Sequence, residues 1–235
     1  LLNRAAWIDG LGLAVKSATI FPGNAATSDP TVNGGVTLYR DSDGALEALV
    51  DFHLVTKWKT AGDSLLAARK LAREDSRNIL IIGAGTVARS LVQAYSAAFP
   101  EASFTVWNRT HANALAFAAS IPGMAVAENL EHAVKAADII TSATMTTEPN
   151  LKGEWLQAGQ HVDLIGAYRP DMREVDDEAL RRSRIFVDSF DTTVGHIGEL
   201  KIPLAASVIS RGDLVADYYA LSRFFRTADS DITLF

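Results

Sequence analysis

The segment Ile79-Leu80-Ile81-Ile82-Gly83-Ala84-Gly85-Thr86-Val87-Ala88 decides the fold class of this 235-residue chain. Its four consecutive apolar residues predict a strand that is buried on both faces. The pattern G-x-G-x-x-A follows at once, and apolar residues at helical spacing then predict a helix from Val87 to Phe99. A strand, a glycine-rich turn and a helix in this order are typical of the unit that opens a parallel sheet.

Short apolar runs alternate with helical stretches from residue 75 to about residue 200, as in βαβ units. The first seventy residues differ, because β-rich runs around the turn Asp41-Ser42-Asp43-Gly44 predict an antiparallel sheet. An amphipathic helix from Thr60 to Arg73 connects the two parts, and a last helix covers 213–225. We predict an α/β fold whose Rossmann-type sheet has six strands, at 79–82, 104–107, 124–127, 138–141, 162–165 and 185–188.

The composition excludes several kinds of chemistry. The chain has 22 Lys and Arg, 28 Asp and Glu, and no Cys, so disulfides, zinc–thiolate centres, iron–sulfur clusters and thiol catalysis are excluded. A net charge of −6 argues against a dedicated binder of nucleic acid or of an anionic membrane. No apolar run approaches the ~18 residues of a membrane helix, so we expect a soluble protein. We also expect a cytoplasmic location and neither nucleic acid nor a membrane as a partner.

The glycine motif predicts a dinucleotide site. Gly83 permits the tight turn, Gly85 lets the backbone approach a pyrophosphate, and the small Ala88 lets helix and strand pack closely. The helix N-terminus offers free N–H groups to the phosphates. The residues expected to bind the cofactor here are Gly83, Ala84, Gly85, Thr86 and Val87.

The residues after the second strand of this sheet predict which dinucleotide is bound. An NAD site usually has Asp or Glu there, which accepts from the ribose 2′-hydroxyl and would repel a 2′-phosphate. This chain has Asn108, Arg109 and Thr110, whose amide, guanidinium and hydroxyl suit a 2′-phosphate. We therefore expect NADP(H) to be preferred over NAD(H). The alternative interpretation is a surface arginine beside a helix-capping threonine.

A series of further segments runs through the chain in a characteristic order: Val15-Lys16, Phe21-Pro22-Gly23-Asn24, Leu49-Val50-Asp51, Trp58-Lys59-Thr60-Ala61, Leu71-Ala72-Arg73, Ser142-Ala143-Thr144, His161-Val162-Asp163-Leu164-Ile165-Gly166-Ala167 and Arg169-Pro170-Asp171-Met172-Arg173-Glu174. This series resembles the ornithine cyclodeaminase/mu-crystallin family. The resemblance implies a homodimer with a substrate and dimerisation domain, 1–72 completed by 201–235, and a dinucleotide-binding Rossmann domain, 73–200. Measured against the family, we expect an N-terminal segment and a short C-terminal tail to be missing.

The resemblance allows more than one chemistry. Cyclodeaminases use NAD and carry a catalytic Asp soon after the strand that ends in Gly166, where this chain has Tyr168. Without that base, and with Asn108-Arg109-Thr110, the chain looks more like the NAD(P)H-dependent branch that includes mu-crystallin. We predict a reductase of cyclic imino acids or ketimines that forms proline or pipecolate from Δ1-pyrroline-2-carboxylate or Δ1-piperideine-2-carboxylate. The alternatives are an ornithine cyclodeaminase or amino-acid dehydrogenase using NAD, and a non-catalytic NADPH-dependent binder of a small ligand.

The resemblance also implies the residues that act on the substrate. Lys16 matches an active-site lysine that either holds the substrate carboxylate or donates a proton. Lys59 matches a position where many relatives have an arginine that binds this carboxylate. Thr60 either caps the helix that we expect it to start or donates to the cofactor phosphates. Tyr168 either lines the substrate pocket or packs against its neighbours.

The ends of two later strands complete the expected cofactor site. Ser142, Ala143 and Thr144 follow one strand at its carboxyl end, where open α/β sheets bind ligands. Gly166 and Ala167 resemble a small pair that lies under the nicotinamide. We expect no metal site, because His161 and Asp163 share a strand face without a third ligand. The polar loop 171–174 is expected to be hydrogen-bonded locally and to contain no acid/base pair.

Overall fold

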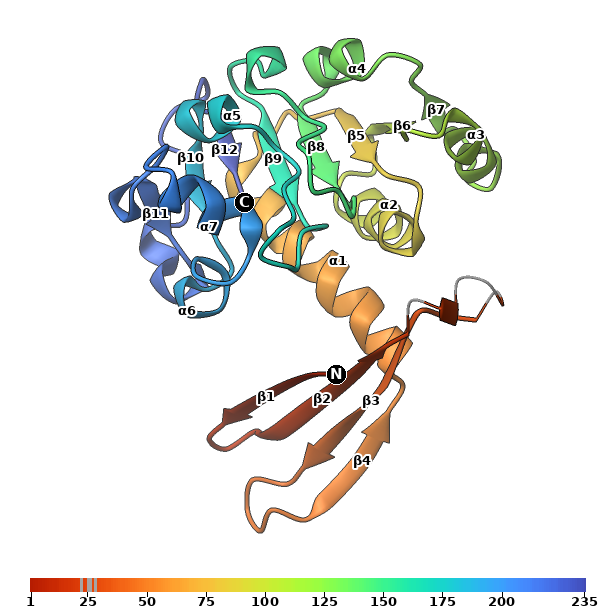
Figure 1. The fold of residues 1–235 in the computed structure, drawn as a ribbon, viewed down its shortest axis with the longest axis vertical. Coiled ribbons are helices and arrows are strands. Elements are labelled where there is room, and N and C mark those ends of the chain that lie inside the picture. Colours follow the sequence, from red (N-terminus) through yellow and green to blue (C-terminus); the bar gives the residue numbers. More distant parts are fainter. Residues whose placement is uncertain (22, 25–26, 28) are drawn as a thin grey trace. The chain divides into compact units, whose positions relative to one another are not determined.

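The computed structural model describes residues 1–21, 23–24, 27 and 29–235 (Figure 1). The chain divides into two compact units, Leu1–Lys59 and Thr60–Phe235. The first unit contains a four-stranded antiparallel sheet and the second a parallel sheet of eight strands, which confirms the expected fold class. Pro22, in the segment that resembles the family at 21–24, lies outside the described residues.

The antiparallel sheet of the first unit has one packed face and one uncovered face. Phe52 packs on the first face so closely that a Cβ atom on Gly34 would lie 2.7 Å from its ring. The register places Trp7, Val15 and Leu49 on the opposite face, where Trp7 and Leu49 are 68% and 76% exposed. The strands, in their order across the sheet, are β1 (Leu2–Ile8), β2 (Gly12–Ile20), β3 (Val32–Tyr39) and β4 (Leu46–Val50).

Helix α1 (Phe52–Leu71) begins eight residues before the expected start at Thr60. The carboxylate of Asp51 accepts a hydrogen bond from the backbone N–H of Leu54 at 2.7 Å, so Asp51 caps the helix. The capping interpretation of Thr60 is therefore wrong, because Thr60 lies in the interior of the helix. No helix in the described part of the chain has the length and apolar content needed to cross a membrane.

The parallel sheet of the second unit has the strand order β11-β10-β12-β9-β8-β5-β6-β7. Strands β6 and β7 extend the sheet on one side of β5, whereas β8 and β9 extend it on the other, so the strand order reverses between β5 and β8. The strands are β5 (Asn78–Ile82), β6 (Ser103–Trp107), β7 (Ala125–Val126), β8 (Ile139–Ser142), β9 (His161–Leu164), β10 (Arg184–Phe186), β11 (Leu214–Ala216) and β12 (Thr233–Leu234).

Both faces of this sheet are covered, which explains the unbroken apolar run of β5. Ile79 and Ile81 pack into one buried cluster with residues of α2, and Leu80 and Ile82 pack into a second cluster. The helices of this unit, after the shared α1, are α2 (Thr86–Ala98), α3 (His111–Ala119), α4 (Leu130–Ala136), α5 (Asp177–Arg182), α6 (Phe190–Thr193) and α7 (Gly198–Ala205).

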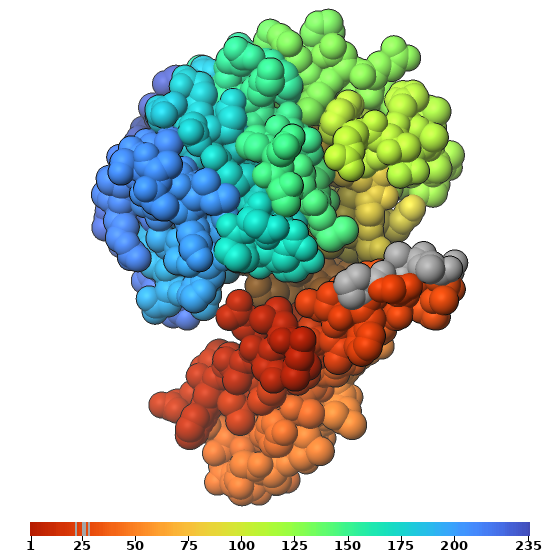
Figure 2. Space-filling model, viewed as in Figure 1, coloured from red at the N-terminus to blue at the C-terminus, as the bar shows by residue number. Residues whose placement is uncertain are grey.

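The C-terminal segment differs from the sequence expectation. In place of a helix over 213–225, the chain forms β11 and then a short 3₁₀ helix, Tyr218–Arg223. The final strand, β12, lies between β9 and β10, so the sheet has eight strands and not six. The structure divides the chain at 59/60 in place of 72/73, and residues 201–235 belong to the second unit, where their blue surface adjoins the cyan surface of neighbouring elements (Figure 2).

Long-range contacts explain this placement of the C-terminal segment. The hydroxyl of Thr233 donates to the backbone carbonyl of Leu71 at 3.1 Å, and the ring of Phe224 lies 5.0 Å from that of Phe186. Both contacts involve residues that are buried in the core of the second unit. The segment therefore completes the parallel-sheet core, a role that its local pattern does not indicate.

Candidate functional site

The carboxyl ends of four neighbouring strands, β9, β8, β5 and β6, meet at one edge of the parallel sheet. Backbone hydrogen bonds hold them together: Gly83 N–H donates to Trp107 at 2.8 Å, and Ala143 N–H donates to Ile82 at 2.9 Å. The structure thus brings together the predicted cofactor residues at 83–87, 108–110, 142–144 and 166. Of the other predicted residues, Thr60 and Tyr168 also belong to the second unit, and Lys16 and Lys59 belong to the first.

The two glycines of the motif have different environments. Gly83 has a φ of +110°, and a Cβ atom there would lie 2.9 Å from the carbonyl oxygen of Ala143, so both backbone strain and space require glycine. Gly85 is exposed and extended (φ −92°), and a Cβ atom there would meet no protein atom within 4 Å. Since Gly85 is also the N-cap of the 13-residue helix α2, the open space beside it fits a pyrophosphate group.

A positively charged side chain, Arg109, is exposed just after the end of β6. No ion pair to Arg109 is found among the described residues. Asn108 donates its side-chain N–H to the carbonyl of Thr110 at 3.0 Å, which orders this turn. Thr110 is the N-cap of α3, but its hydroxyl makes no hydrogen bond to the backbone of the helix. The hydroxyl can therefore donate to a ligand.

A buried carboxylate, Glu174, binds two of the strand ends together. Its Oε1 accepts hydrogen bonds from the hydroxyl of Ser142 at 2.5 Å and from the N–H and hydroxyl of Thr144 at 2.8 and 2.6 Å. Its Oε2 accepts from the N–H of Gly166 at 2.7 Å. The hydroxyls of Ser142 and Thr144, two of the residues predicted to bind the cofactor, therefore donate to Glu174. Burial raises the pKa of the Glu174 carboxyl group.

A second buried carboxylate, Glu199, holds the backbone of Glu174. It lies in the first turn of α7 and accepts from the N–H groups of Glu174 and Val175 at 2.6 and 3.2 Å. Burial raises the pKa of Glu199 to about 7. The sequence predicts that the loop at 171–174 is hydrogen-bonded locally, whereas the hydrogen-bond partners of the Glu174 carboxylate lie 8 to 32 residues away. The role of Glu199 cannot be predicted from the sequence, because only tertiary contact joins it to that loop.

The predicted substrate lysines lie in the first unit. Lys16 is half-buried on β2, and its ammonium lies 4.9 Å from the centroid of the Phe52 ring. Burial, followed by the positive charge of Lys59, lowers the pKa of Lys16. A lowered pKa brings an ammonium closer to the range in which it can donate a proton. Tyr168, in the loop after β9, is 48% exposed, with the Arg169 guanidinium 5.9 Å from its ring centroid.

Two further buried groups of β9 have structural partners. One oxygen of Asp163 accepts hydrogen bonds from the hydroxyls of Ser64 and Thr141, the second at 2.7 Å, and its other oxygen has no hydrogen-bond partner among the described residues. His161 shares a hydrogen bond of 3.0 Å with the hydroxyl of Thr233, and burial lowers its pKa to about 3. The described residues contain no group of three side chains that could hold a metal ion.

Burial raises the pKa of Asp163 from 3.8 to about 7. Between about pH 4 and pH 7 the folded protein therefore keeps a proton that the unfolded chain has released, and stability falls as the pH rises through this window. Asparagine cannot titrate, so we expect Asp163→Asn to reduce the change in the free energy of unfolding across this pH window by roughly 2–4 kcal/mol. Urea unfolding of both proteins at pH 4.5 and pH 7 measures the difference, and parallel pH profiles would contradict the raised pKa.

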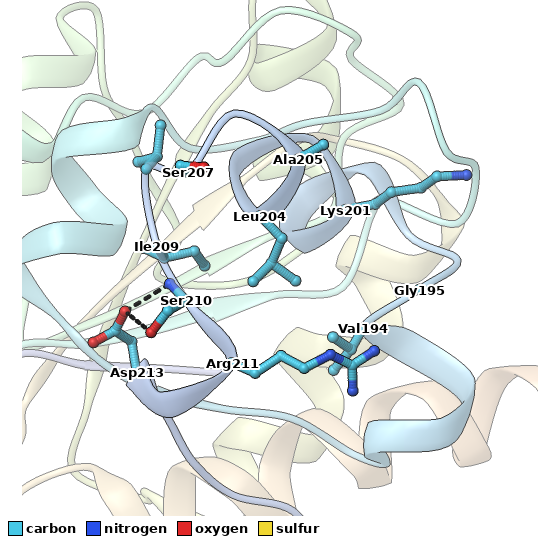
Figure 3. A pocket seen from close by; sticks show the side chains of 11 residues that line it. Val194, Gly195, Lys201, Leu204, Ala205, Ser207, Ile209, Ser210, Arg211 and Asp213 are labelled. Carbon is cyan, nitrogen blue, oxygen red and sulfur yellow. Dashed lines mark hydrogen bonds between the residues drawn. The ribbon is translucent and has the colours of Figure 1, made fainter.

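A hollow of about 770 Å³ is lined by residues 194–195 after α6, by α7 and by the segment 207–213 before β11 (Figure 3). Its lining includes Val194, Leu204 and Ile209 with the cations Lys201 and Arg211. At its edge, Asp213 accepts hydrogen bonds from the N–H and hydroxyl of Ser210 at 2.7 and 2.9 Å. None of the predicted site residues lines this hollow, so the carboxyl edge of the sheet remains the candidate site.

The profile of the ornithine cyclodeaminase/mu-crystallin family matches residues 8–235. The chain belongs to this family. It is 46% identical to the Δ1-pyrroline-2-carboxylate reductase of Paracoccus denitrificans (strain Pd 1222), over the whole chain and 77% of that protein. Membership confirms the resemblance and accounts for the order of the segments along the chain.

Two solved structures of this family's fold are similar to the chain over its full length. The Δ1-pyrroline-2-carboxylate reductase of Thermococcus litoralis, in complex with NADH and L-proline, superposes with a TM-score of 0.88 at 29% identity and is covered to 80%. An archaeal alanine dehydrogenase dimer with bound NAD superposes with a TM-score of 0.88 at 25% identity and is covered to 78%.

Proposed function

We propose that this family member is an NAD(P)H-dependent reductase of cyclic imino acids, which forms proline or pipecolate from Δ1-pyrroline-2-carboxylate or Δ1-piperideine-2-carboxylate. The observation that carries the proposal is the 46% identity to a Δ1-pyrroline-2-carboxylate reductase over the whole chain. Such a reaction would place the protein in proline and amino-acid metabolism. The carboxyl edge of the parallel sheet supports a dinucleotide cofactor, because Gly85 leaves open space at the N-terminus of α2.

The residues of the edge would bind and orient this cofactor. The N–H groups at Gly85, Thr86 and Val87 would hold the pyrophosphate, and Ala143 and Gly166 would adjoin the nicotinamide end. When bound, the cofactor supplies the hydride that adds to the imine carbon. The protein then has to hold the imino acid in place and provide a proton for the nitrogen.

Lys16 and Lys59 would supply the charges that the substrate needs. Two ammonium groups suit the carboxylate of an imino acid, and the lowered pKa of Lys16 suits a proton donor. Tyr168, where cyclodeaminases have an Asp, would line the pocket without acting as a base.

The experiment that tests the function follows the oxidation of NADPH and NADH when each cyclic imine is added to the purified protein. Turnover of either imine supports the proposal. No change in absorbance with both imines and both cofactors would overturn it, and cofactor binding without turnover would favour the non-catalytic binder.

We propose that NADP(H) is preferred, because Arg109 is an exposed cation at the end of β6 and no carboxylate stands at 108–110. We expect Arg109→Asp to weaken NADPH binding by about 100-fold and NADH binding by less than threefold. Titrations of nicotinamide fluorescence measure both affinities. The charge-conserving Arg109→Lys is the control and should retain most of the preference. An equal loss for both cofactors would contradict a role in binding the 2′-phosphate.

A second candidate is an amino-acid dehydrogenase, which is favoured by the TM-score of 0.88 to the archaeal alanine dehydrogenase. It would oxidise an open-chain amino acid with NAD, in place of reducing a ring. Reduction of NAD⁺ by L-alanine but not by L-proline would establish it. Ammonia release from ornithine would identify a cyclodeaminase.

We also propose a homodimer formed through the uncovered face of the antiparallel sheet, which carries Trp7, Val15 and Leu49. Side chains as large and as exposed as Trp7 and Leu49 on one sheet face are typical of an interaction surface. Sedimentation equilibrium of the protein gives its oligomeric state directly.

A further inference from the structure

Two strand ends at the candidate site depend on a single side chain. Glu174 accepts four hydrogen bonds: three from Ser142, the last residue of β8, and Thr144, and one from Gly166 after β9. It is fully buried, so water does not compete for these donors. Gly166 lies so close that a Cβ atom there would be 2.2 Å from the carbonyl oxygen of Thr144. The two loops are therefore fixed at one spacing.

Glu199 extends this connection to α7. Its carboxylate accepts from the N–H groups of Glu174 and Val175, so the backbone that carries Glu174 is fixed as well. A Cβ atom on Gly198 would lie 2.5 Å from the carbonyl oxygen of Met172, so the start of α7 is packed directly on the loop before Glu174. Two buried carboxylates therefore connect α7 to the edge of the sheet: Glu199 holds the backbone of Glu174, and Glu174 holds the two loops.

We infer that Glu174, held in place by Glu199, is a positioning residue that sets the spacing of loops 142–144 and 165–167 for the nicotinamide half of the cofactor. The inference rests on the proposed function and adds a residue to it. The adenine half would bind at the other end of the edge, near the end of β6, whereas the hydrogen bonds of the Glu174 carboxylate go to Ser142, Thr144 and Gly166. Loss of Glu174 should therefore affect one half of the cofactor and spare the other.

The test compares Glu174→Gln with a matched control at the opposite edge of the same sheet. The carboxylate of Asp138, before β8, also accepts four hydrogen bonds. Two come from the backbone N–H groups of Arg77 and Asn78 at 2.9 Å each, one from the side-chain amide of Asn78 at 3.3 Å and one from the Arg73 guanidinium at 3.2 Å. Asp138→Asn therefore removes a comparable structural carboxylate far from the strand ends of the site. For each protein we would measure the melting temperature, kcat and KM for the imine, and two affinities.

The two affinities separate the halves of the cofactor. One ligand is NADPH and the other is 2′-phospho-ADP-ribose, which lacks nicotinamide; NADH and ADP-ribose replace them if the wild type prefers NADH. We expect Glu174→Gln to weaken binding of the complete cofactor about 10-fold and to change the affinity for the truncated ligand by less than twofold. We expect kcat to fall by at least ~30-fold. Asp138→Asn should lower the melting temperature and leave kcat and both affinities unchanged.

Each outcome decides a separate question. If Glu174→Gln weakens binding of both ligands equally, or has the same kcat as Asp138→Asn, the positioning role is overturned but the proposed function is not affected. If the wild-type protein binds no nicotinamide cofactor, the proposed function itself fails. If Glu174→Gln does not fold, Glu199→Gln provides the same comparison, with an expected loss of 3–10-fold in kcat and again no change for the truncated ligand.

Discussion

We expect Gly85→Asp to abolish dinucleotide binding in a protein that folds at least as stably as the wild type. Gly85 has an extended backbone and open space around its Cβ position, so an aspartate fits there. As the N-cap of α2, this aspartate would accept hydrogen bonds from the first N–H groups of the helix, and its negative charge would interact favourably with the helix dipole. Its charge would repel a pyrophosphate at the same place, and we expect affinity for NADPH and NADH to fall by at least ~100-fold.

Two further substitutions identify the cause of that loss. Gly85→Asn has nearly the same shape and no charge, so the difference between Asn and Asp measures repulsion alone. Gly83→Ala should instead lower the stability of the protein. The φ of +110° is unfavourable for alanine, and its Cβ atom would lie too close to the carbonyl of Ala143. Fluorescence titration and thermal unfolding give the two quantities. Tight cofactor binding by a folded Gly85→Asp protein would exclude the edge at α2 as the pyrophosphate site.

We expect Lys16→Met to lower kcat for imine reduction by about 100-fold and to leave cofactor affinity unchanged. The substitution removes the ammonium but keeps an apolar stem against Phe52, so the packing of β2 is retained. General acid catalysis contributes about 10²–10⁴ to a rate, which sets the size of the effect. The substitution changes none of the residues that are predicted to bind the cofactor, so binding of NADPH should not change.

Lys16→Arg separates the two roles that the sequence leaves open for Lys16. Arginine keeps the positive charge but does not release a proton near neutral pH. If Lys16 donates the proton, Lys16→Arg should have a normal KM and a low kcat. If Lys16 only holds the substrate carboxylate, both constants should stay near those of the wild type. Steady-state kinetics with the imine measure both constants, and an unchanged rate for Lys16→Met would remove Lys16 from the active site.

Local sequence determined the first half of the parallel sheet. The run Ile79–Ile82 is apolar throughout because both of its faces are covered, and the turn at Gly83 needs a positive φ that glycine adopts at little cost. Such patterns depend on neighbours a few residues apart, so they can be recognised without knowing the rest of the fold. The same holds for helix α2, which is predicted over 87–99 and covers Thr86–Ala98.

Tertiary structure alone decided the parts that depend on distant partners. Strand β12 has only two residues and too little pattern to predict, and its place between β9 and β10 follows from pairing with both. Glu174 and Glu199 are 25 residues apart and are ordinary surface residues by type, until the approach of α7 to the loop after β9 buries them together. A periodic pattern or a turn is specified by adjacent residues, whereas a buried hydrogen bond between remote residues exists only once the whole chain has packed.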